Sequence, residues 1–95
     1  MELIRFTDFK LTERNKAIAN MFFDHNGNEV MAQFIFYLQR DECLGIRVGR
    51  HDGAVPTVEL ENYINKNKPD LKKLVKPEVV RVKAERLQML ASENS

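Results

Sequence analysis

The sequence has too few cysteines and too few long apolar runs for several classes of protein. Its single cysteine, Cys43, cannot form an intramolecular disulfide, which excludes a small secreted domain held together by disulfides. No apolar run approaches the roughly 18 residues that cross a bilayer. The N-terminus also lacks the basic start and apolar stretch of a secretory signal. These absences predict a cytoplasmic protein with no membrane contact.

Groups that carry catalysis or bind metals are equally sparse. His25 and His51 are the only histidines, and with one cysteine they lack the paired spacing of a zinc site. The glycines between positions 45 and 53 match neither phosphate-binding pattern. Cys43 and His51 could meet at a strand end, but no glycine-flanked turn or helix start follows Cys43 to activate its thiol. We therefore expect no catalytic residue, no metal and no cofactor, and a protein that is not an enzyme.

The composition that remains is typical of a folded domain. The 95 residues are 43% hydrophobic and 31% charged with a net charge of +1, a balance that disordered chains do not show. This length has room for one modest core. We expect a single domain over residues 1–95, mostly β over 1–53 and helical over 57–91, with a frayed tail at 92–95.

The clearest local signal is a β-hairpin around Asn26-Gly27. These two residues separate two alternating apolar runs and tolerate the positive φ angles that a two-residue turn requires. Strand partners then have residue numbers that sum to 53, so that Phe23 faces Val30 and Ala17 faces Phe36. The pairs on that side of the sheet are all apolar and alternate small with large side chains, which predicts the core face.

Two further strands and a helical half complete the predicted fold. Residues 44–50 form a third strand, and residues 3–11 form a fourth with a bulge at Asp8. Thr57 can cap a helix that ends near Lys68, because Pro69 follows, and Pro77 can begin a last helix to about residue 91. The fold class is α+β: an antiparallel sheet of three to four strands packed by two to three C-terminal helices.

The last helix carries more apolar surface than one sheet can cover. At 100° per residue its docking stripe is expected to be Val80, Ala84, Leu87 and Ala91. Val82 and Met89 then point away from the sheet, with the long stem of Arg86 between the two faces. Because exposed apolar anchors characterise interfaces, we predict a contact through Val82, Arg86 and Met89 with a protein partner or a second copy of the chain.

The reverse face of the sheet offers a second candidate surface. If Ile46 and Val48 lie on the core face, Arg47 lies beside Tyr37 on the reverse face, with Lys16 on the other side of the ring. His51 is expected nearby, and such a cluster can stack a base and neutralise a phosphate. A cation and aromatic pair that only stabilises the sheet explains the same residues. The loop at 40–43 also permits the other register, which would place Ile46 and Val48 on the reverse face.

Charge distribution and the lack of catalytic motifs lead to two functional hypotheses. Residues 1–61 carry 7 Lys/Arg against 10 Asp/Glu, whereas residues 62–95 carry 8 against 4. The first hypothesis is a small non-enzymatic regulatory or inhibitory protein that binds a protein partner. The alternative is a nucleic-acid-binding module that uses the reverse sheet face and the basic helical half, although a net charge of +1 is small for that role.

Overall fold

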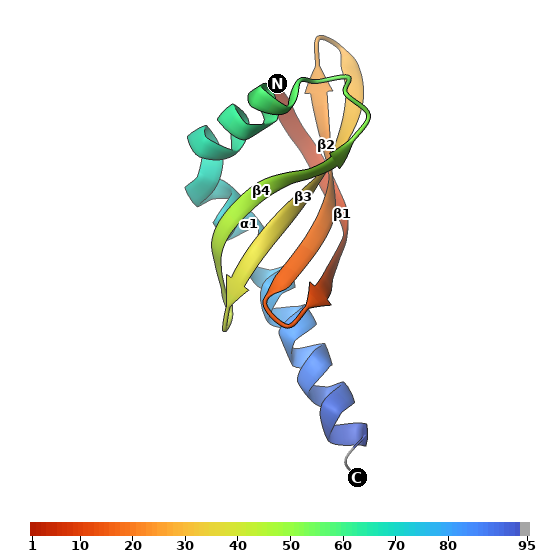
Figure 1. Ribbon diagram of the computed structural model, residues 1–95, viewed down its shortest axis with the longest axis vertical. Coiled ribbons are helices and arrows are strands. Elements are labelled where there is room, and N and C mark those ends of the chain that lie inside the picture. The colour runs from red at the N-terminus through yellow and green to blue at the C-terminus, as the bar shows by residue number, and fades with distance from the viewer. Residues whose placement is uncertain (94–95) are drawn as a thin grey trace.

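The computed structural model describes residues 1–93 as a four-stranded sheet followed by one long helix (Figure 1). The elements are β1 (Glu2–Glu13), β2 (Lys16–His25), β3 (Asn28–Gln39), β4 (Glu42–His51) and α1 (Thr57–Glu93). All neighbouring strands are antiparallel and follow the chain order β1-β2-β3-β4. The predicted α+β class and antiparallel sheet are confirmed. In place of the expected two to three helices, the described residues form one.

The predicted hairpin between β2 and β3 is confirmed in register. Asn26 and Gly27 have φ angles of 53° and 81°, as the two-residue turn requires, and Gly27 N–H donates to Asp24 Oδ1 at 3.0 Å. The pairs run without a shift from His25↔Asn28 to Lys16↔Tyr37. Turn chemistry and the apolar alternation favour the same pairing, so the register is strongly specified.

The edge strands also follow the predictions. Asp8 has a φ of 57° and lies in a register shift between Thr7 and Lys10, which confirms the bulge in β1. In β4, Ile46 pairs with Phe36 and Val48 pairs with Phe34. Ile46 and Val48 therefore lie on the core face, and the alternative register of β4 is wrong.

The helical half differs most from the sequence prediction. Pro69 and Pro77 lie inside α1, although both were expected to separate helices. Each proline removes one helical hydrogen bond and bends the helix, and Figure 1 shows α1 curving along the twisted sheet. Leu71 and Val75, between the two prolines, are buried in the core. Their burial favours a continuous helix despite the proline cost of about 3 kcal/mol each.

The face of α1 that packs on the sheet is also not the expected one. Val79 is fully buried and Val82 is 6% exposed, whereas Val80 is 44% exposed and Leu87 is 68% exposed. The predicted stripe through Val80, Ala84 and Leu87 therefore faces solvent, and Val82 does not point away from the sheet. Apolar residues at 79, 80 and 82 point in different directions around the helix and made both stripes possible. Only the path of the bent helix selects one of them.

The end of α1 corrects two smaller predictions. The helix continues to Glu93, so residues 92 and 93 of the expected frayed tail are helical. Residues 94 and 95 of that tail lie outside the described residues, as does the side chain of Ala91 from the predicted stripe. The helix therefore ends at Glu93 and not near residue 91 as predicted.

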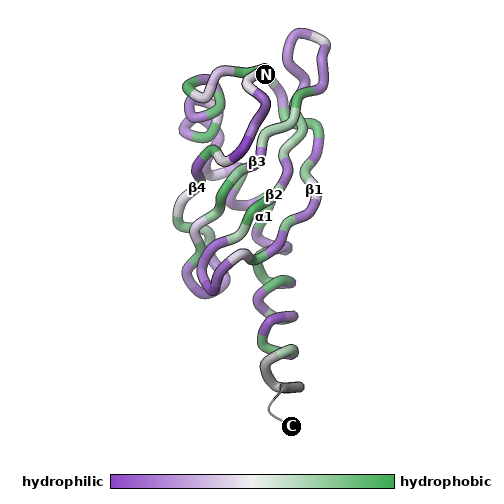
Figure 2. The backbone as a smooth tube through the Cα atoms, turned by 45° about the vertical axis from the view of Figure 1, so that its right-hand side comes forward, coloured by the Kyte–Doolittle hydropathy of each residue, from purple (hydrophilic) through white to green (hydrophobic). Residues whose placement is uncertain are grey.

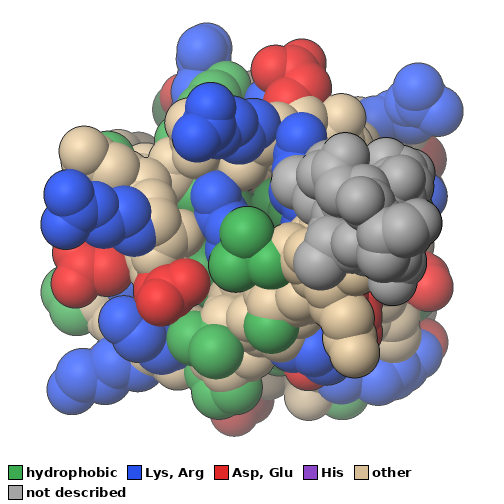
Figure 3. Space-filling view, turned by 90° about the horizontal axis from the view of Figure 1, so that it is seen from below, with side chains coloured by type: hydrophobic (Ala, Val, Ile, Leu, Met, Phe, Trp, Pro, Cys, Tyr) green, Lys and Arg blue, Asp and Glu red, His purple; other side chains and the backbone are tan. Residues whose placement is uncertain are grey.

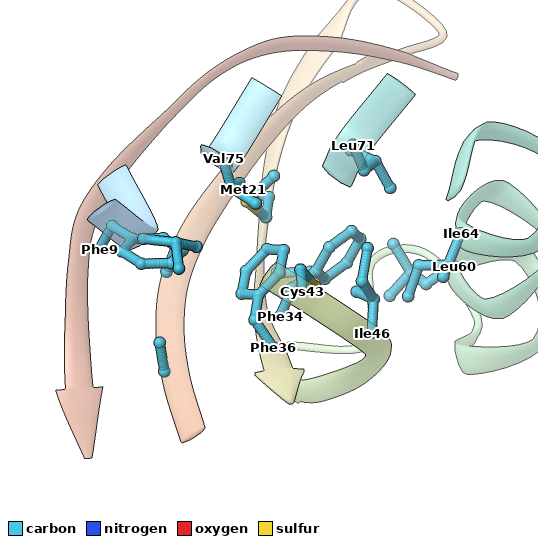
Figure 4. Close-up of a cluster of buried hydrophobic side chains, with 14 of the residues drawn as sticks. Phe9, Met21, Phe34, Phe36, Cys43, Ile46, Leu60, Ile64, Leu71 and Val75 are labelled. Atoms are coloured by element: carbon cyan, nitrogen blue, oxygen red, sulfur yellow. The ribbon is translucent and has the colours of Figure 1, made fainter. Parts of the chain in front are cut away.

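One apolar core lies between α1 and the sheet (Figure 4). Phe9 and Phe36 have ring centroids 5.4 Å apart, and Phe23 and Phe34 are 5.6 Å apart. The helix contributes a buried row that consists of Leu60, Ile64, Leu71, Val75, Val79 and Val82. Because α1 covers only this face, the opposite face of the sheet has no second layer over it within the described residues.

Candidate functional site

The uncovered side of the sheet, which we call the open sheet face, is one candidate binding surface. Its central residues on β2 and β3 are half-buried or exposed and mix apolar, amide, aromatic and basic groups. They form the cross-strand pairs Lys16↔Tyr37, Ile18↔Ile35, Asn20↔Gln33 and Phe22↔Met31. A surface of this kind is neither a dry core nor a fully hydrated face, which is consistent with a binding role.

Tyr37 lies on the open sheet face between the cations predicted from the sequence. Lys16 is its direct partner on β2, and Gly45 is its direct partner on β4. A Cβ atom on Gly45 would lie 3.9 Å from Tyr37 Cδ2, so the tyrosine side chain packs over this glycine. Arg47 pairs with Ile35, one position along the same face. The structure thus brings Lys16, Tyr37 and Arg47 onto one surface, and their binding role stays a prediction.

His51 makes two local contacts at the end of β4, and its predicted binding role on the open sheet face stays a prediction. Gly53 N–H donates to His51 Nδ1 at 3.1 Å, and His51 Nε2 lies 2.8 Å from Thr57 Oγ1. Nδ1 is therefore an acceptor, which leaves the proton on Nε2 to be donated to the threonine hydroxyl. The ring connects the end of β4 to the start of α1.

The same contact changes the predicted role of Thr57. Its hydroxyl lies against His51, and the first helical hydrogen bonds are accepted by the Pro56 carbonyl from Glu59 N–H at 3.0 Å and Leu60 N–H at 3.3 Å. Pro56 therefore occupies the cap position, and Thr57 is the first helical residue. Sequence spacing alone could not indicate that the hydroxyl would bind a histidine.

Sequence reasoning missed a cationic group at the other end of the open sheet face. The Arg5 guanidinium lies 4.4 Å from the centroid of the Phe22 ring and forms an ion pair of 2.6 Å with Glu29. Arg5 faces Phe22 because β1 shifts its register between Leu3 and Arg5. No sequence motif predicts that shift. The alternation of polar and apolar residues around position 5 was the only signal that could have placed Arg5 beside Phe22.

The C-terminal part of α1 extends beyond the sheet and is the second candidate surface. We call residues 83–93 the distal helix. Lys83 Nζ donates to Arg14 O at 2.8 Å, and Arg81 Nη2 donates to Phe9 O at 3.2 Å, which fixes α1 against β1 and the following turn. Past this point α1 projects away from the sheet, and hydrophobic positions continue along it (Figure 2).

The residues predicted to bind a partner are divided by this geometry. Val82 lies in the core, whereas Arg86 is exposed and Met89 is 66% exposed on the distal helix. Leu87, which was expected to dock on the sheet, joins Met89 as an exposed apolar side chain. Figure 3 views the molecule from this end and shows hydrophobic side chains among many Lys and Arg side chains.

The groups considered for nucleophilic chemistry do not come together. Cys43 and His51 lie near opposite ends of β4, eight residues apart in an extended strand, so about 26 Å of backbone separates them. Burial raises the pKa of the Cys43 thiol, against a lowering effect from the positive charges of Lys72 and Lys68. The thiol is therefore less ionised than a free cysteine, which disfavours it as a nucleophile.

Among the side chains that the structure describes, those of residues 1–89, no three His, Cys, Asp or Glu side chains are grouped so that they could hold a metal ion. In the same residues, no helix combines the length and apolarity needed to cross a membrane. No protein-family model, no curated protein sequence and no solved structure matches the chain.

Proposed function

We propose that this protein is a small non-enzymatic regulator or inhibitor that acts by binding another protein through its distal helix. The observation that carries the proposal is the exposure of Leu87 and Met89, at 68% and 66%, on a helix that has already left the sheet. Apolar anchors surrounded by polar groups characterise protein interfaces, and methionine suits adaptable ones.

The length of the distal helix supports the same proposal. Its 11 residues extend about 16 Å, and isolated helices shorter than about 12 residues are marginal in water. The segment is continuous with the packed part of α1, which nucleates it, but the side chains from Ala84 to Met89 are all exposed and gain nothing from packing on the sheet. Leu87 and Met89 lie about 200° apart around the helix axis, so a partner that wraps around the distal helix would bury both and supply the missing tertiary stabilisation.

The double variant Leu87→Glu/Met89→Glu tests the proposal. Both side chains are exposed, so the free energy of unfolding should change by less than about 0.5 kcal/mol. The matched control, Asn62→Glu/Gln88→Glu, adds the same two charges at exposed positions of α1 without removing an apolar side chain. Light scattering of both variants reports whether a second copy is the partner.

Site-specific crosslinking identifies a different partner. A photoreactive amino acid at position 87 should yield one discrete crosslinked protein in the native lysate, and Met89→Glu should abolish that product. The same photoreactive group at position 62 should give none. An unchanged mass by light scattering, together with no specific product at position 87, would refute a role for the distal helix in binding.

A second candidate function is the binding of single-stranded nucleic acid on the open sheet face. The specific observation is the placement of Tyr37 beside Lys16 and one position from Arg47, on a face that α1 leaves uncovered. Aromatic side chains stack bases in a sequence-tolerant way, at about 1–3 kcal/mol per base. Cations on either side would neutralise phosphates.

Salt dependence and a tyrosine series test this candidate. Contacts with three phosphates predict a log–log salt slope of about −2 for a labelled single-stranded oligonucleotide measured by fluorescence anisotropy. Tyr37→Phe should retain stacking, whereas Tyr37→Ala should weaken binding at least fivefold. Equal affinities of these two variants would contradict base stacking on Tyr37.

A further inference from the structure

β4 is the sheet edge whose backbone is better arranged to accept another strand. Both β1 and β4 are terminal in the sheet, so each has backbone groups on its outer side without a strand partner among the described residues. The pairing of β1 is interrupted by three register shifts. The pairing of β4 with β3 has two, one between Cys43 and Gly45 and one between Val48 and His51, and it is regular from Gly45 to Val48. Bulges blunt an edge, so β4, which has fewer of them, is the better template for strand addition.

A groove lies beside the first half of β4, between this strand and α1. A hollow of about 390 Å³ is lined by Glu42, Cys43, Leu44, Lys72, Lys73 and Lys76. A second hollow of about 470 Å³ shares Glu42 and Lys76 with the first and continues to the turn between β3 and β4. The two form one groove that begins at Arg40 and follows β4.

The groove carries unbalanced positive charge and an apolar wall. Its cations are Lys72, Lys73, Lys76 and Arg40, and its acids are Asp41 and Glu42. Among the described side chains, those of residues 1–89, the salt bridges involve the cations Arg5 and Arg81 only, so the four groove cations have no ion-pair partner in that part of the chain. Leu44 is half exposed at the groove and adds an apolar contact. The complementary ligand is therefore anionic and partly apolar.

We propose that an extended acidic segment of a partner protein binds in this groove as a fifth strand on β4. The backbone of the segment would pair with β4, and every second side chain would face α1. Acidic side chains at those positions would meet Lys72, Lys73 and Lys76, and an apolar side chain would contact Leu44. This surface is separate from the distal helix, so the inference does not depend on the function proposed above.

A peptide fits this groove better than a nucleic acid does. A strand edge offers main-chain donors and acceptors at the spacing of another polypeptide, which a phosphate backbone does not match. Asp41 and Glu42 also lie in the groove and would repel a chain with one charge per nucleotide. A peptide with acidic residues at alternate positions can avoid those two carboxylates.

The first test uses a fluorescein-labelled eight-residue peptide that alternates glutamate and valine. Fluorescence anisotropy should detect binding to the full chain, and added salt should weaken it. Lys72→Glu/Lys73→Glu/Lys76→Glu should reduce the affinity at least tenfold. The control Lys10→Glu/Arg14→Glu/Lys66→Glu makes the same change in net charge at exposed residues outside the groove, and should reduce it less than threefold. Equal losses in the two variants, or no binding at all, would overturn the proposal.

Two checks make this comparison independent of folding and of ligand class. Circular dichroism must show that each variant is folded, and Lys72→Gln/Lys73→Gln/Lys76→Gln replaces the glutamate variant where that one is not. A labelled single-stranded oligonucleotide serves as the competing ligand. If it binds more tightly than the peptide and loses affinity in the groove variant alone, the groove binds nucleic acid and the peptide proposal is wrong.

The second test examines the main-chain pairing. Two versions of the peptide are N-methylated at alternate residues, one on the odd positions and one on the even. Only one set of N–H groups can face β4 in an added strand, so one version should lose at least tenfold in affinity and the other should be little affected. Equal effects of the two methylation patterns would show that the peptide does not pair with β4.

Discussion

Two adjacent valines in α1 provide a direct test of how the helix packs on the sheet. Val79 is fully buried, whereas Val80 is 44% exposed and was expected from the sequence to be a docking residue. Each can be replaced by alanine, which removes the same two methyl groups and keeps a good helix former. The pair therefore differs in environment and not in chemistry, so the Val80 variant is a matched control for the Val79 variant.

The expected magnitudes follow from burial and helix propensity. Removing two buried methyl groups from Val79 costs about 1.6 kcal/mol of transfer free energy, and the cavity that remains adds to this cost. The higher helix propensity of alanine offsets about 0.5 kcal/mol. Val79→Ala should therefore lower the free energy of unfolding by about 2 kcal/mol, a large fraction for a small domain. Val80→Ala should leave it unchanged or raise it by up to about 0.5 kcal/mol.

Urea unfolding followed by circular dichroism at 222 nm measures both values. The two variants should keep the m-value of the parent chain, so that midpoints report stability directly. If Val80→Ala proves as destabilising as Val79→Ala, or more so, α1 does not pack on the sheet through its Val75, Val79 and Val82 face. In that case Leu87, which belongs to the same stripe as Val80, would face the sheet, and its exposure would no longer support a binding role.

Three further predictions concern the turn, the core and the pH dependence. Gly27→Val should destabilise the fold by more than about 1 kcal/mol, because a β-branched residue resists the φ of 81° at this position, and a neutral result in urea melts would contradict the two-residue turn. Phe36→Ala should cost about 3–5 kcal/mol, because its ring is fully buried, whereas Tyr37→Ala on the open sheet face should cost much less; the reverse order would mean that the faces are exchanged. Burial raises the pKa of the Cys43 thiol above its ordinary 9.0 and that of the Tyr63 hydroxyl above 10.0, so the folded chain holds both protons more tightly than the unfolded chain. The resulting stability should be fully present below pH 9 and be lost as the pH rises beyond it, and Cys43→Ala/Tyr63→Phe should make that loss smaller than in the parent chain.

Local chemistry in the sequence was enough to determine the central hairpin of the sheet. Asn26-Gly27 defines the turn, and the period of two in the flanking runs then fixes every pair between β2 and β3. The bulge at Asp8 was visible as a break in that alternation. The placement of Lys16 beside Tyr37 follows from the same period, whereas the sequence left two registers open for β4 and only the structure places Arg47 on that face. In each case the deciding interactions are between neighbours in the chain or across one hairpin.

The tertiary structure alone decided the course and orientation of α1. Pro69 and Pro77 are local stop signals, but burial of the residues around them outweighs the lost hydrogen bonds and keeps one helix. Apolar residues at consecutive positions left the docking face ambiguous until the bent helix met the twisted sheet. His51 bonds to Thr57 because the chain turns back between β4 and α1. The distal helix exists because the sheet ends before α1 does. The groove beside β4 exists because the lysines of α1 come close to β4 only in the folded chain.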